Sequence, residues 1–521
     1  MAKKGFLLNA KVCGNCLTPE GLAPKLSACS RCGLVVYCSR DCQRAHWKSN
    51  HKQNCVAKAD RVPQRQQPLS TQVNDASSAV LAGEKCAICQ DLLTNASSAC
   101  ALPCKHVFHG TCVADLRKFG VEHACPLCRT SLSPGSEESF VEATRRYTVI
   151  RRLVKRGEAS WSDLPASAQR EVDAAVNGWR AAADEGFVSA QCNLGLVFEH
   201  GLGVLQSHEA AAQWYRKAAD QGHMVAQCSL GGLFDEGLGV AQSYEVAAMW
   251  YRKAADQGMS NAQYNLGVMF TQGHGVAQSY VEAARWIKKA ADQGEKDAQL
   301  SLGSLYSDGL GVVQSHSTAA AWYKKAAVQG NATAQHKLGY AYEVGIGMSQ
   351  SDKEALRWYR KAAEQEYAAG QLAVGIFYEQ GRGVEVNFSE AARWIKMAAD
   401  QGETDAQLNL GYLYSGGFGV VQSHSTAAAW YKKAAVQGNA VAQHRLGYLY
   451  EVGIGMSQSD KEALRWYRKA ADQGHAQAQL AVGVFYETGR EVEQNSSEAA
   501  RWVKKAADQG HSNAQAYLGS L

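Results

Sequence analysis

Proline is missing from most of this chain. All eight prolines of the 521 residues lie at or before Pro165, so the last 356 residues contain none. Because proline interrupts helices, a long stretch without it that is rich in glycine and alanine is compatible with helices broken only by glycine turns. Cysteine is also confined, since 14 of the 16 lie between Cys13 and Cys128. These absences divide the chain into a cysteine-rich first quarter and a helical remainder.

Long apolar segments are absent as well. No run approaches the roughly 18 apolar residues that a membrane-spanning helix needs, and the apolar stretch after Met1 is too short for a secretory signal peptide. We therefore expect no membrane partner and a cytoplasmic or nuclear location, where thiols stay reduced. In these compartments closely spaced cysteines indicate metal ligands sooner than disulfides.

A tryptophan recurs every 36 residues in the proline-free part. The series comprises Trp214, Trp250, Trp286, Trp322, Trp358, Trp394, Trp430, Trp466 and Trp502. Nine units of this length span about 187–510, after a lone second helix near 167–186 and before a lone first helix at 511–521. A fixed period of this size is typical of repeat proteins whose units stack on one another.

Each unit is predicted to form two helices. Apolar residues in both halves recur at intervals of three and four residues, as on one face of a helix. In the unit of Trp250 they are Ala226, Leu230, Leu233 and Phe234 in the first helix, and Ala247, Trp250, Tyr251, Ala254 and Ala255 in the second. Gly237 is suited to end the first helix, and Ser351-x-x-Glu354 and Ser459-x-x-Glu462 have the form of capping boxes.

The period and the motif resemble the Sel1-like repeat family. The resemblance implies an α-solenoid adaptor over 187–521, with nine full units and a partial tenth. Glu366 departs from the motif by replacing the terminal glycine of one unit, and Gly370 by replacing the alanine that opens the next. Residues 311–364 recur almost unchanged at 419–472, which indicates a duplication of three units.

Two interpretations of the solenoid remain. A concave groove that binds peptide segments of partner or substrate proteins is the functional one, and an inert spacer is the alternative. The recurring Gly-x-Gly follows a helix instead of a strand, so it predicts a turn and not a phosphate-binding loop. We expect Cys192 and Cys228 to be small buried residues, and His336 and His444 to have no metal role.

The first cysteine cluster contains eight candidate metal ligands. They are Cys13, Cys16, Cys29, Cys32, Cys38, Cys42, His51 and Cys55. Seven thiols and one imidazole suffice for two tetrahedral Zn2+ ions. A module this small has no apolar core, so metal binding would supply much of its folding free energy. Residues 56–82 after it are polar and without pattern, which predicts a flexible linker.

The first cluster, 13–55, resembles the MYND zinc finger. The resemblance implies that Cys13, Cys16, Cys38 and Cys42 hold one zinc ion, and that Cys29, Cys32, His51 and Cys55 hold the other. MYND fingers bind short proline-containing peptides, and Gln43 and Trp47 match the part of the motif that lines the peptide groove. Simple core packing is the alternative for Trp47.

The second cluster, 86–129, again contains eight ligands, six thiols and two imidazoles. They are Cys86, Cys89, Cys104, His106, His109, Cys112, Cys125 and Cys128, and the spacing resembles a RING finger of the H2 type. The family's cross-brace implies one zinc ion on Cys86, Cys89, His109 and Cys112, and another on Cys104, His106, Cys125 and Cys128. Four structural zinc ions are therefore expected in the chain, and Cys100 is left over.

Zinc saturated by four protein ligands cannot activate water, so any activity must come from the protein surface. Ile88, Pro126, Leu127 and Arg129 match the surface with which RING ubiquitin ligases dock a ubiquitin-conjugating enzyme, and Leu116 lies where many RINGs carry tryptophan. The resemblance implies a RING-type ubiquitin ligase without a covalent catalytic residue. A non-enzymatic zinc-binding scaffold is the alternative.

Residues 136–186 are expected to connect the fingers to the solenoid and to cap it. Between 136 and 156 a heptad-like apolar pattern comprises Phe140, Ala143, Tyr147, Ile150 and Val154. A rigid helix that docks on the solenoid is one interpretation, and dimerisation is the other. Basic residues cover much of its remaining surface, but the chain has no recognised nucleic-acid reader, so nucleic acid is not the expected partner. The predicted fold class is mostly α: two small cross-brace zinc fingers followed by an α-solenoid.

Overall fold

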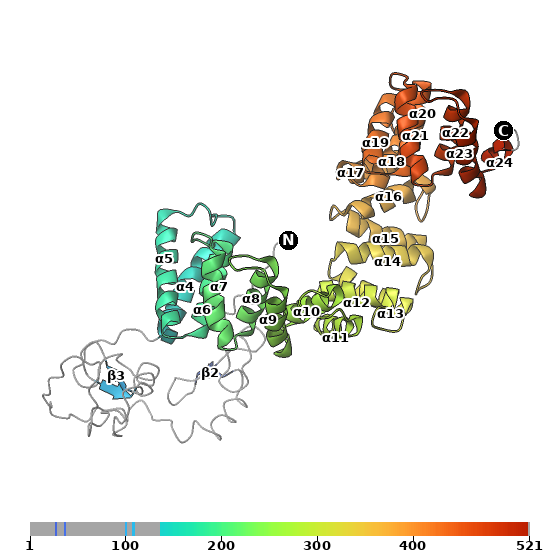
Figure 1. Ribbon diagram of the computed structural model, residues 1–521. Helices are drawn as coiled ribbons and strands as arrows, with labels where there is room; N and C mark the ends of the chain where they lie inside the picture. Colours follow the sequence, from blue (N-terminus) through green and yellow to red (C-terminus); the bar gives the residue numbers. More distant parts are fainter. Residues whose placement is uncertain (1–26, 29–35, 38–98, 102–106, 110–135, 519–521) are drawn as a thin grey trace, which may run out of the picture. The chain divides into compact units, whose positions relative to one another are not determined.

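The computed structural model describes residues 136–518 and four short strands before them (Figure 1). Strand β1 (Ser27–Ala28) pairs with β2 (Val36–Tyr37), and β3 (Ala99–Ala101) pairs with β4 (Val107–His109). Both pairs are antiparallel, with Ser27 opposite Tyr37 and Ala99 opposite His109. The chain divides into two compact units, Met1–Ala190 and Gln191–Leu521.

Two helices, α4 (Ser136–Lys155) and α5 (Ala166–Asp184), form the described helical part of the first unit. The apolar stripe of α4 packs on α5, and Tyr147 at its centre is buried between the rings of Trp161 and Trp179, with centroid distances of 5.3 and 4.8 Å. Trp179 Nε1 donates a hydrogen bond of 2.9 Å to Thr144 Oγ1. The apolar stripe of α4, for which we considered docking and dimerisation, is therefore covered by α5 and Trp161 of the same chain.

The remaining helices follow one another in pairs (Figure 1). The first helices of the units are α6 (Val188–His200), α8 (Met224–Glu236), α10 (Ser260–Gln272), α12 (Lys296–Asp308), α14 (Ala332–Val344), α16 (Ala368–Gln380), α18 (Thr404–Gly416), α20 (Ala440–Val452), α22 (Ala476–Thr488) and α24 (Ser512–Leu518). The second helices are α7 (His208–Asp220), α9 (Tyr244–Asp256), α11 (Tyr280–Asp292), α13 (His316–Val328), α15 (Asp352–Ala363), α17 (Phe388–Asp400), α19 (His424–Val436), α21 (Asp460–Asp472) and α23 (Ser496–Asp508).

The helix ends follow from local sequence. Gly237 ends α8 in the left-handed conformation at φ 69°, which glycine adopts without a steric penalty. Ser351 caps the N-terminus of α15, and its side chain accepts a hydrogen bond of 3.3 Å from the Glu354 backbone N–H. The reciprocal half of the predicted capping box is not formed, because the Ser351 backbone N–H donates 2.8 Å to the Tyr342 carbonyl, and the Glu354 carboxylate accepts from Arg357. Ser459 and Glu462 repeat this arrangement at the start of α21.

The predicted apolar stripes form the core of the solenoid. All nine residues assigned to the two stripes of the Trp250 unit are buried. The two helices approach closely because Gly231 of α8 has no side chain, and a Cβ there would lie 2.9 Å from the Tyr251 ring. The fold is thus mostly α, as predicted, with helix pairs stacked in a solenoid.

A ladder of buried glutamines joins consecutive units. Gln227 Nε2 in α8 donates 3.1 Å to the Ala219 carbonyl of α7, and its Oε1 accepts 2.7 Å from Gln257 at the end of α9. The same pair of bonds recurs at Gln263, Gln299, Gln335, Gln371, Gln407, Gln443 and Gln479. Because a buried amide must find partners, the ladder fixes how one unit sits on the next.

Candidate functional site

The described strands belong to the two zinc-finger regions. The connection between β1 and β2 contains Cys29 and Cys32, and the connection between β3 and β4 contains Cys104 and His106. Two ligands at such short spacing suit one ion, because a single short stretch of chain supplies both. Thiols and imidazoles are also the donors that structural Zn2+ prefers, so the residues fit the expected metal.

Most predicted site residues of the fingers lie outside the described residues. This holds for Gln43 and Trp47 of the peptide groove and for the predicted enzyme-docking residues Ile88, Leu116, Pro126, Leu127 and Arg129. It holds also for the zinc ligands, with the exception of His109, whose backbone ends β4. Their roles therefore stay predictions.

The described part of the solenoid provides no cluster of three or more histidine, cysteine or acidic side chains arranged to hold a metal ion. Cys192 is buried, as expected, and burial raises the pKa of its thiol to about 12. Cys228, at the equivalent place one unit later, is only partly buried, which differs from the expectation. His444 packs against the rings of Tyr467 and His475, and burial lowers its pKa to about 4.

One contact between consecutive units was not predicted. At four places the residue that opens a second helix meets the central residue of the next unit's Gly-x-Gly turn (Gly-Arg-Glu at 489–491), 30 positions later. We call this contact the clasp. It takes the form of stacked rings for Tyr244 and His274, of two packed phenylalanines for Phe388 and Phe418, and of ion pairs for Asp352 with Arg382 and Asp460 with Arg490.

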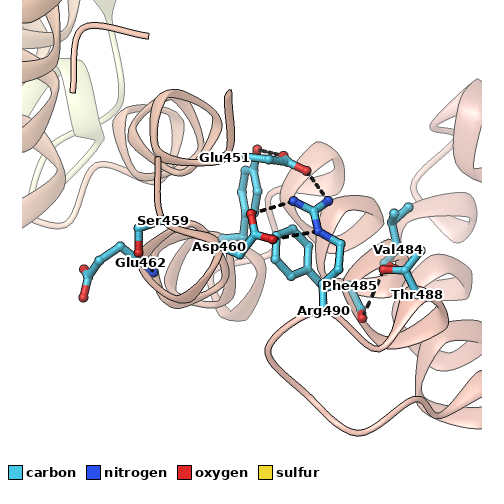
Figure 2. A network of polar contacts seen from close by, with 9 residues as sticks. Glu451, Ser459, Asp460, Glu462, Val484, Phe485, Thr488 and Arg490 are labelled. Carbon is cyan, nitrogen blue, oxygen red and sulfur yellow. Dashed lines mark hydrogen bonds and ion pairs between the residues drawn. The ribbon is translucent and has the colours of Figure 1, made fainter. Parts of the chain in front are cut away.

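The clasp at Arg490 is a network of charges and rings (Figure 2). The guanidinium donates to both oxygens of Asp460, at 2.7 and 3.0 Å, and to Glu451 at 2.8 Å. The other Glu451 oxygen accepts 2.8 Å from the Tyr467 hydroxyl, and the guanidinium carbon lies 4.4 Å from the centroid of the Phe485 ring. Hydrogen bonding to Asp460 holds the pKa of Arg490 above its ordinary value, and Arg490 in turn lowers the pKa of Asp460.

The pairing of opposite charges 30 residues apart was a signal available in the sequence. Arginine stands at the centre of the turn only at 382 and 490, and in both cases aspartate opens the helix 30 residues earlier. Without the fold there was no reason to compare these two places, because they belong to different units.

Several apolar side chains of the solenoid remain exposed. Tyr340, Tyr412 and Tyr448 occupy equivalent positions on α14, α18 and α20, and each is about half exposed. Val313 and Val421 follow equivalent Gly-x-Gly turns and are almost fully exposed. Exposed aromatic residues on equivalent positions of several repeats are typical of surfaces that bind other proteins.

The helix pairs match the Sel1 repeat family nine times in succession, between residues 188 and 511. The chain belongs to the Sel1 repeat family. In this Sel1 repeat protein the repeats are preceded by a MYND finger, matched at 12–55, and by a Ring finger domain, matched at 84–129. The order of the three modules is the one predicted from the sequence.

Solved structures and curated proteins extend this result. The crystal structure of c5321, a protective antigen of uropathogenic Escherichia coli, is 35% identical and superposes with a TM-score of 0.61 over 71% of this chain and 82% of its own. The E3 ubiquitin-protein ligase RNF181 of Xenopus laevis is 38% identical over 72 residues, which are 13% of this chain and 45% of that protein. RING-H2 finger protein ATL40 of Arabidopsis thaliana is 44% identical over 55 residues, 10% of this chain and 24% of its own length.

This chain therefore spans less than half the length of the curated relatives that it matches. The similarity supports a RING finger of the kind found in ubiquitin ligases, and the Sel1 repeats support protein interaction. Among the helices that the structure describes, none combines the length and the apolar character needed to cross a membrane.

Proposed function

We propose that this Sel1 repeat protein is a RING-type ubiquitin-protein ligase whose solenoid holds the protein to be modified. The supporting observation is the RING finger at 84–129 together with its 38% identity to the ligase RNF181 over 72 residues. Cytoplasm or nucleus is the proposed location.

The chemistry that we propose needs no covalent intermediate on this chain. Ile88, Leu116, Pro126 and Leu127 would dock the ubiquitin-conjugating enzyme by apolar contact. Arg129 would donate hydrogen bonds to carbonyl oxygens of both the enzyme and its thioester-linked ubiquitin, because a guanidinium has five donors in a fixed plane. Restricting the motion of the thioester favours attack by the incoming amine. Four Zn2+ ions would hold the two fingers folded.

The other two modules would select the protein to be modified. Gln43 and Trp47 of the MYND finger are proposed to bind a proline-containing peptide. The exposed tyrosines and valines of the solenoid offer a second surface, which is supported by their exposure as apolar side chains. Their exposure favours a partner-binding surface over an inert spacer.

A ubiquitin-transfer assay tests the proposal. The full chain with its zinc content measured is incubated with ubiquitin, activating enzyme and a panel of conjugating enzymes, and we expect polyubiquitin chains. Arg129→Ala and Ile88→Ala should abolish them. Arg145→Ala is the matched control, because Arg145 is exposed on α4 and pairs with Glu142 only by an exposed ion pair.

Two outcomes would contradict the ligase proposal. One is the absence of chains across the whole panel although four zinc ions are bound. The other is chain formation that survives both RING substitutions, since the activity would then come from a contaminating ligase. Partner binding without ubiquitin transfer would support the non-enzymatic scaffold instead.

A further inference from the structure

Glu379 in α16 lacks the partners that two of its equivalents, in α14 and α20, have. Glu487 in α22 lacks them too, and its Oε2 is buried without a hydrogen-bond partner among the described residues. Glu343 of α14 and Glu451 of α20 occupy the same position in their helices. Each accepts a hydrogen bond from a tyrosine 16 residues later and an ion pair from an arginine 39 residues later. These partners are Tyr359 and Arg382 for Glu343, and Tyr467 and Arg490 for Glu451.

For Glu379 both partner positions hold apolar residues. Ile395 stands 16 residues later and Phe418 stands 39 residues later. In the part of the chain that the structure describes, no side chain hydrogen-bonds to the Glu379 carboxylate or forms an ion pair with it. Glu379 is nonetheless only partly exposed, and burial raises its pKa. A partly buried carboxylate without a partner is destabilising, so a cation that reaches it gains binding free energy.

Three exposed aromatic rings lie beside the turn that replaces the arginine. The Phe418 ring centroid is 5.5 Å from that of Phe388 and 5.8 Å from that of Tyr412. Their exposed fractions are 38%, 37% and 49%. Gly416 makes room for this cluster, because a Cβ at that position would overlap the Phe418 ring. Such rings attract cations through their π faces.

We propose that Glu379, Phe388, Tyr412 and Phe418 form a docking site for an arginine side chain of a partner protein. We call it the arginine site. Arginine is favoured because the chain itself places one beside the two equivalent glutamates, Glu343 and Glu451. The aspartate and the phenylalanine that these arginines also contact are replaced here by Phe388 and Leu413. Arg382 and Arg490 each bind carboxylates there, with the guanidinium carbon 4.4 Å from a phenylalanine ring centroid.

The occupant is a partner, because the chain's own turn carries Phe418 where the other two carry arginine. A planar guanidinium can bond a carboxylate and stack on aromatic rings at once, whereas lysine offers a point charge only. The inference rests on the partner-binding part of the proposed function. It does not depend on ubiquitin transfer, so either can fail while the other holds.

A binding experiment on the full chain tests the arginine site. N-acetyl-arginine methylamide is titrated and followed by saturation-transfer NMR, with N-acetyl-citrulline methylamide as the neutral analogue of the same shape. We expect transfer to the arginine compound, and binding weaker by about tenfold or more for citrulline and for Glu379→Gln, because a charge-assisted hydrogen bond is lost. Glu343→Gln, at the equivalent carboxylate that Arg382 already occupies, is the matched control and should bind as the wild type does.

A second variant supplies the missing intramolecular partner. Phe388→Asp with Phe418→Arg recreates the clasp residues found at 352/382 and 460/490, so we expect it to fold with unchanged helical content and to lose arginine binding. Equal binding of the arginine and citrulline compounds, or binding unchanged in Glu379→Gln, would overturn the proposal. So would sedimentation showing that wild-type chains self-associate through this site and that the double variant does not, because the occupant would then be a second copy.

Discussion

Arg490 and Asp460 lie 30 residues apart and join consecutive units of the solenoid by two hydrogen bonds, one from the guanidinium Nη2 and one from Nε. Such a bidentate pair is directional, so it specifies the orientation of one unit on the next as well as stabilising the contact. Arg382 and Asp352 form the same pair three units earlier.

Removing this arginine should destabilise the solenoid locally. Arg490→Leu leaves Asp460 and Glu451 partly buried without their cation, and we expect a loss of about 1–3 kcal/mol in the free energy of unfolding. Urea unfolding followed by circular dichroism measures it. Arg465→Leu, which removes a well-exposed i,i+3 pair with Glu462, is the control and should cost no more than about 0.5 kcal/mol. Equal losses in the free energy of unfolding for the two substitutions would show that the clasp stabilises the solenoid no more than an exposed ion pair does.

Two glutamates occupy backbone positions that suit glycine. Glu366 and Glu491 have φ values of 61° and 57°, while the equivalent residues in most other units are glycines. Glu366→Gly should stabilise the protein by about 1 kcal/mol, since the left-handed strain exceeds the added entropy of the unfolded chain. Glu491→Gly should gain more, because a Cβ at the equivalent Gly455 would overlap the backbone of the preceding unit.

Thermal unfolding of the two variants and of a reversed change tests this account. Gly474 occupies the position equivalent to Glu366 three units later and has a φ of 90°. Gly474→Glu should therefore lower the stability of the protein. Stabilisation by Gly474→Glu, or destabilisation by both glycine substitutions, would contradict the strain argument.

His444 should make stability depend on pH. Burial is the main cause that lowers its pKa from 6.5 to about 4 in the folded state, followed by the nearby charges of His475 and Arg445. The folded state therefore favours the neutral imidazole. Because the folded-state pKa lies below the unfolded value, His444 leaves the free energy of unfolding unchanged above about pH 6.5. As pH falls from 6.5 toward 4, the unfolded chain binds the proton more readily than the folded one, and the free energy of unfolding decreases by about 1–3 kcal/mol.

His444→Gln should flatten this part of the pH profile. Urea unfolding of wild type and variant at pH 8, 6 and 4.5 measures the slope, and the two proteins should differ in it only below about pH 6.5. An identical slope at all three pH values would show that His444 does not carry the effect.

Zinc removal should unfold the two fingers and leave the solenoid folded. We expect four zinc ions per chain by elemental analysis, and a strong chelator should release them with little change in ellipticity at 222 nm, because the helical repeats contain none of the predicted ligands. Cys112→Ser should lower the zinc content and abolish ubiquitin transfer. Collapse of the helical signal on chelation would contradict an independent solenoid.

Much of the solenoid could be predicted because its signals are local and repeated. The 36-residue spacing of Trp250 and its equivalents, the apolar stripes and the cap at Gly237 each depend on a few neighbouring residues, and the structure confirms them. The zinc fingers were predicted from ligand spacing, and the family matches confirm both finger types. The capping boxes were only half right, because the Ser351 backbone N–H that would donate to Glu354 donates instead to the Tyr342 carbonyl of the preceding helix, a tertiary contact.

The sequence by itself determined the modules, their order and the repeating helix pair, since period, ligand spacing and turn residues act over short distances. Only the tertiary structure decided that Asp460 meets Arg490, and that among the described residues no side chain pairs with Glu379 as Arg382 pairs with Glu343. These relationships depend on how one unit packs on the next. Each residue alone resembles an ordinary charge on a helix or turn, and its role follows only from the neighbour that stacking supplies.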